Sequence, residues 1–230
     1  MDRKTYVIIV ASGQKSFIDI EGRPVLRRTM EIFTGAVPGI RVVTVLPREY
    51  VRRWKDYCLS SGFDVPQEIS ESGITRFHSV RAALSRVPDG AIVAIHDGLR
   101  PLVSKELVSR MFSLMLDGRR ALVPVIGTED SPKSLRLQKF EDGSERFEED
   151  SSVLPGKSLI WTAQSPQLFI AEDIREAYAQ AYDTAFTHDA SVAGRKGIPL
   201  TWIRGERYNL RITAPEDFAL ARLIISKPLR

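Results

Sequence analysis

Residues 6–11 read YVIIVA, an almost continuous run of apolar and β-branched side chains that Ser12 and Gly13 follow at once. A strand that is apolar on both faces is typical of a parallel sheet covered by helices on both sides. Further strand-like runs occur along the chain, and segments with helical spacing separate them. The strand-like runs are 40–46, 65–69, 91–95 and 121–126, and the helical segments are 24–33, 49–59, 75–87 and 104–116. This alternation predicts an α/β fold with a doubly wound, mostly parallel sheet.

The alternation stops at Gly127. Within 127–156, the stretch KSLRLQKF alternates apolar with polar residues and Asp142-Gly143 offers a turn, which together predict a β-hairpin. The segment has too few apolar residues for a core of its own, so we expect a protruding β-arm that a second copy of the chain covers. Later segments predict helices at 172–182, 187–194 and 215–225 and an edge strand at 200–204. We therefore expect residues 1–230 to form a single domain whose β-arm makes a homodimer.

Composition narrows the class of protein. The chain has 230 residues, of which 43% are hydrophobic and 27% charged, and it can bury a core without disulfides or metals. It holds one cysteine, Cys58, which we expect to be a small buried side chain and not a nucleophile. The net charge of +4 is spread over the chain without a basic tract, which argues against a nucleic-acid partner. No stretch is apolar for long enough to span a bilayer and no secretory signal is visible, so we expect a cytoplasmic protein with no membrane partner.

Four polar segments are expected where the strands of the sheet end, and ligands bind beyond the carboxyl ends of such strands. Residues 11–15 (ASGQK) follow the first strand; Gly13 allows a close backbone approach and Lys15 can neutralise phosphate. Residues 72–79 (SGITRFHS) open a helix whose first N–H groups, with that of Gly73, are candidates to bind an anion or a base. On local grounds alone, a strand-ending turn and a capped helix explain these two segments as well.

The other two segments carry charged side chains. Residues 96–101 read HDGLRP, and a carboxylate such as Asp97 at the end of a buried strand is costly unless it is paired or used. A salt bridge between Asp97 and Arg100 is the structural alternative. Residues 209–213 read NLRIT, in which Arg211 alternates with apolar neighbours and points away from their face. A surface ion pair explains Arg211 equally well.

Together these segments resemble one known family, the 2-C-methyl-D-erythritol 4-phosphate cytidylyltransferases of isoprenoid synthesis. Residues 92–103 read IVAIHDGLRPLV and resemble the HDxxRP segment of that family. Further matches follow the order of the family and cover nearly the whole chain: FIDIEGRPVL at 17–26, GITRFHSV at 73–80, AQSPQLF at 163–169, HDAS at 188–191 and NLRITAPED at 209–217.

The resemblance implies a Rossmann-like nucleotidyltransferase fold and a homodimer clasped by β-arms. It implies Mg²⁺, CTP and in-line attack by a polyol phosphate on the α-phosphorus, with release of pyrophosphate. Carried over by position, cytidine or its phosphates would be held by Ala11, Ser12, Gly13, Gly73 and Ser79. The catalytic residues would be Lys15, Lys157 and Arg211, and the polyol phosphate would meet Asp97, Ser131, Ser165 and Thr187 as well as Arg211. No direct side-chain ligand of the metal is assigned.

The chain departs from the family at three places. Gly13 is followed almost at once by Phe17, so the arginine of the family's longer first loop has no counterpart. Either a stretch between Gly13 and Gln14 is missing from the sequence as given, or the chain binds triphosphate poorly. Lys157 stands where the family has arginine, and Arg211 where it has lysine, with different hydrogen-bond geometry. Two other functions stay open: ribitol-5-phosphate cytidylyltransferase, which residues 204–209 (RGERYN) resemble about as well, and a non-catalytic nucleotide-binding homologue.

Overall fold

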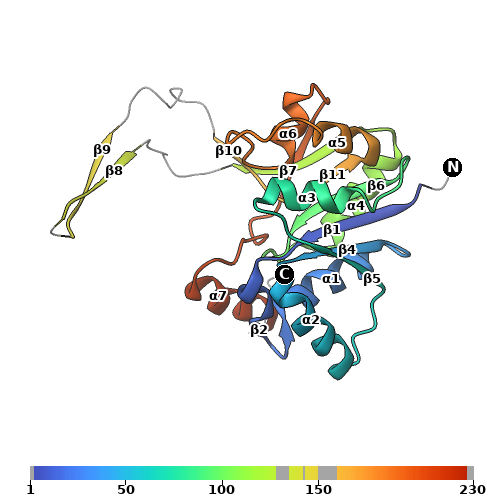
Figure 1. The fold of residues 1–230 in the computed structure, drawn as a ribbon, viewed down its shortest axis with the longest axis horizontal. Helices are drawn as coiled ribbons and strands as arrows, with labels where there is room; N and C mark the ends of the chain where they lie inside the picture. The colour runs from blue at the N-terminus through green and yellow to red at the C-terminus, as the bar shows by residue number, and fades with distance from the viewer. Residues whose placement is uncertain (1–2, 128–134, 142, 150–159, 227–230) are drawn as a thin grey trace.

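The computed structural model describes residues 3–127, 135–141, 143–149 and 160–226. One half of the central sheet is parallel, with strand order β6-β1-β4-β5 (Figure 1). Its strands are β1 (Thr5–Val10), β4 (Arg41–Leu46), β5 (Gln67–Glu71) and β6 (Ile92–Asp97). The run at 6–11 therefore lies in the middle of the sheet with a parallel neighbour on each side, as predicted.

The other half of the sheet is mixed. Strand β11 (Gln167–Ile170) runs antiparallel between β6 and β7 (Ala121–Gly127), and β10 (Trp161–Ala163) pairs antiparallel with the end of β7. Neither β10 nor β11 was predicted, because β10 has only three residues and all four side chains of β11 are buried, so that neither shows an alternation of polar and apolar residues. The expected strand at 200–204 is confirmed as β12 (Thr201–Arg204), which pairs in parallel with β7.

Helices cover both faces of the sheet, and the alternation along β1 separates the two cores. Val7 and Ile9 face one core, and Tyr6 and Ile8 face the other. On the first face lie α1 (Val25–Ala36), α2 (Arg48–Ser60) and α4 (Lys105–Leu116), and on the second lie α3 (Arg76–Leu84), α5 (Ala171–Ala177) and α6 (Asp189–Arg195).

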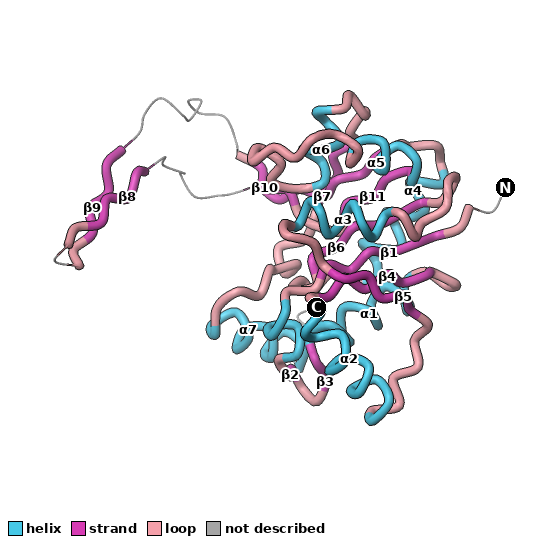
Figure 2. Tube along the Cα trace, in the orientation of Figure 1, coloured by secondary structure: helices cyan, strands magenta, loops and turns pink. Residues whose placement is uncertain are grey.

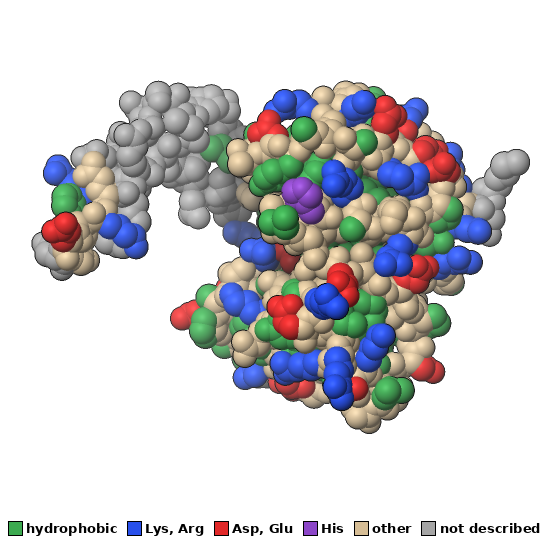
Figure 3. Space-filling view, viewed as in Figure 1, with side chains coloured by type: hydrophobic (Ala, Val, Ile, Leu, Met, Phe, Trp, Pro, Cys, Tyr) green, Lys and Arg blue, Asp and Glu red, His purple; other side chains and the backbone are tan. Residues whose placement is uncertain are grey.

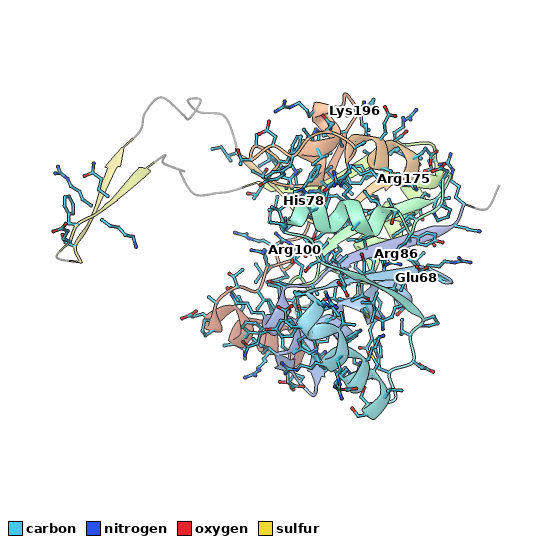
Figure 4. All side chains as sticks on the ribbon, in the orientation of Figure 1. Glu68, His78, Arg86, Arg100, Arg175 and Lys196 are labelled. Carbon is cyan, nitrogen blue, oxygen red and sulfur yellow. The ribbon has the colours of Figure 1, made fainter. Side chains whose placement is uncertain are left out.

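The helix expected at 172–182 is shorter than predicted. It ends at Ala177, after which the N–H of Tyr178 bonds back into the last turn and its buried hydroxyl turns to Asp189. Arg175 of α5 donates to the carbonyl of Leu84 at the end of α3, so the two helices are tied together (Figure 4). None of the described helices is long and apolar enough to cross a membrane.

A third, smaller core joins the two ends of the chain. The short helix η1 (Gly13–Phe17) leads into a hairpin of β2 (Asp19–Ile20) and β3 (Arg23–Pro24), and α7 (Pro215–Ser226) packs on it. Ile20, Leu99, Ile212 and Phe218 form the buried contact. The segment around Arg211 is thereby brought to the loops that follow β1 and β6.

The predicted β-arm is confirmed as an antiparallel hairpin of β8 (Leu135–Lys139) and β9 (Glu145–Glu149). It stands apart from the sheet beyond the end of β7 and the start of β10 (Figures 1 and 2). Over the face drawn in Figure 3, basic and acidic side chains are interspersed, in agreement with the absence of a basic tract in the sequence.

Gly98 lets the loop after β6 pack closely on the end of β1. Its N–H donates to the Val10 carbonyl over 2.9 Å, and an added Cβ would lie 3.0 Å from that oxygen and 3.2 Å from the Ala11 Cα. We predict that Gly98→Ala lowers the free energy of unfolding by about 1–3 kcal/mol, measured by urea denaturation, because backbone atoms must move apart.

Gly194 in α6 is the matched control. An added Cβ there would meet only Leu200 Cδ1 at 3.8 Å, so Gly194→Ala should stabilise by up to about 1 kcal/mol. Equal unfolding midpoints for Gly98→Ala and the parent protein would show that the contact at Val10 is not tight.

Candidate active site

Two adjoining cavities open at the carboxyl ends of β1 and β6. The smaller has a volume of about 250 Å³ and the larger about 350 Å³, and Arg76, Asp97 and Arg211 line both. The smaller is further lined by Val10, Ala11, Ser12, Ser72, Gly73, Ile74, Thr75 and Ser79, and the larger by Arg100, Ala163, Gln164, Ser165, Gln167, Thr187, His188 and Asp189. Of the residues expected for the nucleotide, Ala11, Ser12, Gly73 and Ser79 line the smaller cavity and Gly13 lines neither, while Ser165 and Thr187, expected for the polyol phosphate, line the larger. Three charged side chains lie between the two groups.

Asp97 is the last residue of β6 and its side chain is 18% exposed. One carboxylate oxygen, Oδ1, accepts the Leu99 N–H over 3.0 Å, and Oδ2 accepts Arg211 Nε over 2.5 Å. Burial alone would raise the pKa of Asp97, but the Leu99 N–H and the charge of Arg211 hold it below its ordinary value. The carboxylate is therefore ionised at neutral pH.

The alternative in which Asp97 pairs with Arg100 is wrong. Arg100 Nη1 donates instead to the Asn209 carbonyl over 2.6 Å, and burial lowers the pKa of Arg100. Arg211 does form an ion pair, as the structural alternative expected. Its partner is Asp97, at the rim of both cavities, and half of the Arg211 side chain stays exposed.

The buried His96 supports Asp97 through Ser165. His96 Nε2 lies 3.1 Å from the Arg100 carbonyl and Nδ1 lies 3.1 Å from Ser165 Oγ. Because a carbonyl only accepts, Nε2 carries the proton and Nδ1 accepts the Ser165 hydroxyl. Burial lowers the pKa of His96 to about 4, so the ring is neutral. Ser165 Oγ also accepts the Asp97 N–H over 3.0 Å, which makes Ser165 part of the support of Asp97 as well as a wall of the larger cavity.

The segments that line the smaller cavity are held by their own side chains. Ser12 N–H donates to Ser16 Oγ over 2.8 Å. Gly73 N–H donates to Ser79 Oγ over 3.0 Å, and that hydroxyl donates to the Thr75 carbonyl. The expectation of a free N–H at Gly73 is therefore wrong. Glycine is still required there, since a Cβ would lie 2.6 Å from His78 Cβ.

The first loop is a single 3₁₀ turn over Gly13–Phe17. Gly13 has a φ of +52° and packs on the Tyr50 ring, which an added Cβ would approach to 3.2 Å. Lys15 lines neither cavity; its Nζ donates to the Thr213 carbonyl over 2.7 Å. That bond ties the loop to the segment carrying Arg211.

Three predicted site residues remain. Thr187 lines the larger cavity, whereas Ser131 and Lys157 lie outside the described residues. Sequence reasoning did not assign Arg76 or Gln164 to the site, although both stand in the segments that carry the resemblance, 73–80 and 163–169. Across the described residues, no group of three or more His, Cys, Asp or Glu side chains is placed to hold a metal ion.

Known proteins match the chain in sequence and in fold. The family model described as 2-C-methyl-D-erythritol 4-phosphate cytidylyltransferase matches residues 9–227. A relative of that name from Bacteroides fragilis is 37% identical over 227 residues, which cover 95% of this chain and 98% of the relative. One from Porphyromonas gingivalis is 36% identical over 236 residues, covering 98% and 100%.

Solved structures agree with these relatives. The structure of 2-C-methyl-D-erythritol 4-phosphate cytidylyltransferase from Thermus thermophilus has a TM-score of 0.69 and 26% identity, with coverage of 96% of this chain and 98% of that chain. The structure described as 4-diphosphocytidyl-2C-methyl-D-erythritol synthase from Anaerococcus prevotii has a TM-score of 0.77 at 22% identity, covers 98% and 100%, and supports the fold. With the family model and these relatives matched over almost the full length, the chain belongs to the 2-C-methyl-D-erythritol 4-phosphate cytidylyltransferase family.

Proposed function

We propose that the chain transfers the cytidylyl group of CTP to 2-C-methyl-D-erythritol 4-phosphate and releases pyrophosphate, as a step in the synthesis of isoprenoid precursors. The observation that carries the proposal is the meeting of the two cavities at Arg76, Asp97 and Arg211. Ala11, Ser12, Gly73 and Ser79 support the smaller cavity as the nucleotide side, and Ser165 and Thr187 support the larger as the polyol phosphate side. Both substrates are phosphates that do not cross membranes unaided, so we infer a cytoplasmic enzyme.

The reaction asks little covalent chemistry of the protein. An oxygen of the polyol phosphate forms a bond to the α-phosphorus, the bond from that phosphorus to the bridging oxygen of the β-phosphate breaks, and pyrophosphate leaves with the electron pair. The attacking phosphate is largely ionised at neutral pH, since its second pKa is near 6, so no general base is needed. What remains is to align two phosphates and to offset negative charge as it moves to the leaving group.

The cations suited to that task come from three segments. Arg76 at the start of α3 and Arg211 line both cavities, and Lys15 lies beside Thr213. Arg211 would contact the polyol phosphate while Asp97 fixes its guanidinium, and Lys15 would offset charge on the triphosphate. Ser131, Lys157 and Gly13 complete the proposed site by resemblance alone.

A Mg²⁺ ion fits beside Asp97. Among the described residues that line the smaller cavity, Asp97 is the one carboxylate, and Mg²⁺ commonly binds one or two carboxylates together with substrate phosphates. When bound, the ion would neutralise triphosphate charge, held mainly by the nucleotide with Asp97 nearby.

We also propose a homodimer. A groove of about 630 Å³ lies at the root of the β-arm, lined by Val125, Trp161, Ala163, His188, Trp202, Ile203 and Arg204. Trp161 and Trp202 are 52% and 54% exposed there. An isolated two-stranded hairpin is marginally stable in water, so the arm needs a surface to pack on. The arm of a second copy would cover the groove, which shares Ala163 and His188 with the larger cavity.

The purified chain should release pyrophosphate from CTP in the presence of Mg²⁺ and methylerythritol phosphate, measured by a coupled phosphate assay. Ribitol 5-phosphate should react at least about tenfold more slowly, as for a site that discriminates by about 1.4 kcal/mol. ATP and GTP should be poor donors, because purines are larger than cytosine. A folded sample that turns over neither polyol phosphate would contradict the enzyme proposal, and preference for ribitol phosphate would replace the substrate.

Asp97→Asn and Lys15→Ala test the site itself. Asparagine preserves the bond to Leu99 N–H but removes the charge that holds Arg211, so kcat/KM should fall by a factor of about a hundred or more. Lys15→Ala should also lower turnover, while its melting temperature should hardly change because the side chain is exposed.

Asp183→Asn is the matched control for Asp97→Asn. Asp183 accepts the N–H two residues on, that of Ala185, and pairs with Arg195, the same two contacts away from the cleft. Its variant should keep parental kinetics. Near-parental turnover in both Asp97→Asn and Lys15→Ala would place the active site elsewhere.

The dimer is tested by sedimentation at micromolar concentration. The parent should sediment as a dimer, and Trp202→Glu should shift it toward monomer because a charge would be buried in the groove. Leu59→Glu, at a residue 82% exposed on α2, is the control and should stay dimeric. A monomeric parent protein would refute the proposed assembly.

A further inference from the structure

Two charged side chains from opposite sides of the cleft form a bidentate pair. Arg76, the first residue of α3, donates from Nη1 to Asp189 Oδ1 over 2.8 Å and from Nη2 to Oδ2 over 2.6 Å. Asp189 is the first residue of α6, and the Tyr178 hydroxyl donates to its Oδ1 over 2.6 Å. The start of α3 is thus joined to the start of α6, 113 residues later, at one carboxylate that Tyr178 also contacts.

Burial makes the pair rigid. The Asp189 side chain is 1% exposed, whereas that of Arg76 is 37% exposed. Burial alone would lower the pKa of Arg76, but the charge of Asp189 and its hydrogen bonds raise it above the ordinary value. Arg76 therefore keeps its charge while one edge of the guanidinium is fixed by a carboxylate that water does not reach.

The other edge of the guanidinium is available to a ligand. A guanidinium has five N–H donors, Asp189 accepts two of those of Arg76, and 37% of the Arg76 side chain is exposed. Arg76 lines the nucleotide cavity and the polyol phosphate cavity, while Asp189 lines only the latter. The Asp97 carboxylate also acts on Arg76, since its charge helps to raise the Arg76 pKa. Arg76 thus stands at the junction where the two reacting phosphates must meet.

The pair also connects the segments that form the two walls. On the nucleotide side, Arg76 follows Thr75, the N-cap that accepts the Ser79 hydroxyl at its carbonyl. On the other side, α6 begins one residue after His188 and two after Thr187, and its Ala190 N–H donates to Gln167 Oε1 over 2.7 Å. A displacement of either wall would have to break or stretch the pair.

We propose that Arg76 is a further catalytic residue that contacts the phosphates of both substrates, and that Asp189 is the residue that positions it. The proposal rests on the function proposed above. Two anionic phosphates brought to bonding distance repel each other, and a cation shared between them offsets that repulsion. Because the same guanidinium serves both, its loss weakens the binding of the nucleotide and of the polyol phosphate. Asp189 contributes by fixing the fork, so that its free donors face the junction before either substrate arrives.

The test measures the binding of each substrate. The dissociation constant of an α,β-methylene analogue of CTP, which cannot transfer its cytidylyl group, is measured by calorimetry with Mg²⁺, and that of methylerythritol phosphate is measured with the analogue at saturation. In Arg76→Lys, which keeps a charge but loses the fork, and in Asp189→Asn, both dissociation constants should rise about tenfold and kcat should fall about a hundredfold.

Asp173→Asn is the matched control. Arg120 also pairs with Asp173 through two N–H donors, from Nε and Nη2, on residues that line neither cavity. That variant should keep the parental dissociation constants and turnover even if its melting temperature drops. If Asp189→Asn does not fold, Arg76→Lys and Tyr178→Phe, which removes only the hydroxyl bond to Asp189, decide the question; Tyr178→Phe should weaken the binding of both substrates partly.

The outcomes separate the two proposals. If folded Arg76→Lys and Asp189→Asn bind either substrate as tightly as the parent does, the role of Arg76 is overturned. A parent without turnover on either polyol phosphate would instead overturn the proposed function.

Discussion

A carboxylate at the end of a buried strand is the constraint on which the cleft depends. Strand β6 is covered on both faces, so Asp97 leaves the core with its backbone buried and its charge at the rim. Such a charge is tolerated only with partners, and local residues supply only the Leu99 N–H. The second partner, Arg211, comes from 114 residues later. The third core brings the segment before α7 to the mouth of the sheet, and the pair with Asp97 fixes the Arg211 side chain there.

The two residues that support Asp97, His96 and Ser165, carry no charge at neutral pH. His96 is shielded from water, Ser165 connects it to the Asp97 backbone, and the ring carries no charge at neutral pH. The pKa values of His96 and Asp97 are lower in the folded protein than in the unfolded chain. Both groups therefore stabilise the fold at pH values above their unfolded pKa. As the pH falls, the contribution of His96 is lost from about 6.5 down to about 4, and that of Asp97 is lost at still lower pH. The positive charge facing the cleft at neutral pH thus comes from arginines and not from this histidine.

The sequence was sufficient where the physics is local. The run at 6–11, the helices and the hairpin of the arm each follow from periodicity and turn residues within a short window, and the position of Asp97 flagged it as costly. Pairing over more than a hundred residues was not predictable in the same way. Nothing near Asp97 favours Arg211 over Arg100, and nothing near Arg76 indicates that its fork meets Asp189. Strands β10 and β11 escaped detection for a related reason: neither shows an alternation of polar and apolar residues, and pairing with β7 creates them.

Among the described residues, the arginines that line the cleft come from outside the first loop. In the first loop, the turn at Gly13–Phe17 holds one cation, Lys15, and its ammonium is bonded to the Thr213 carbonyl. The cleft itself is lined by Arg76 and Arg211, and each of them is held by a carboxylate, Asp189 or Asp97. A lysine in either place would bring a point charge, so pairing with the carboxylate would draw that charge away from the ligand. An arginine can bond a carboxylate with one edge and present the other, which allows the walls of the cleft to be braced and charged by the same side chains. For the proposed function, arginine at 211 suits a site in which cations from α3 and from the segment before α7 bind phosphate, with a smaller part for the loop after β1.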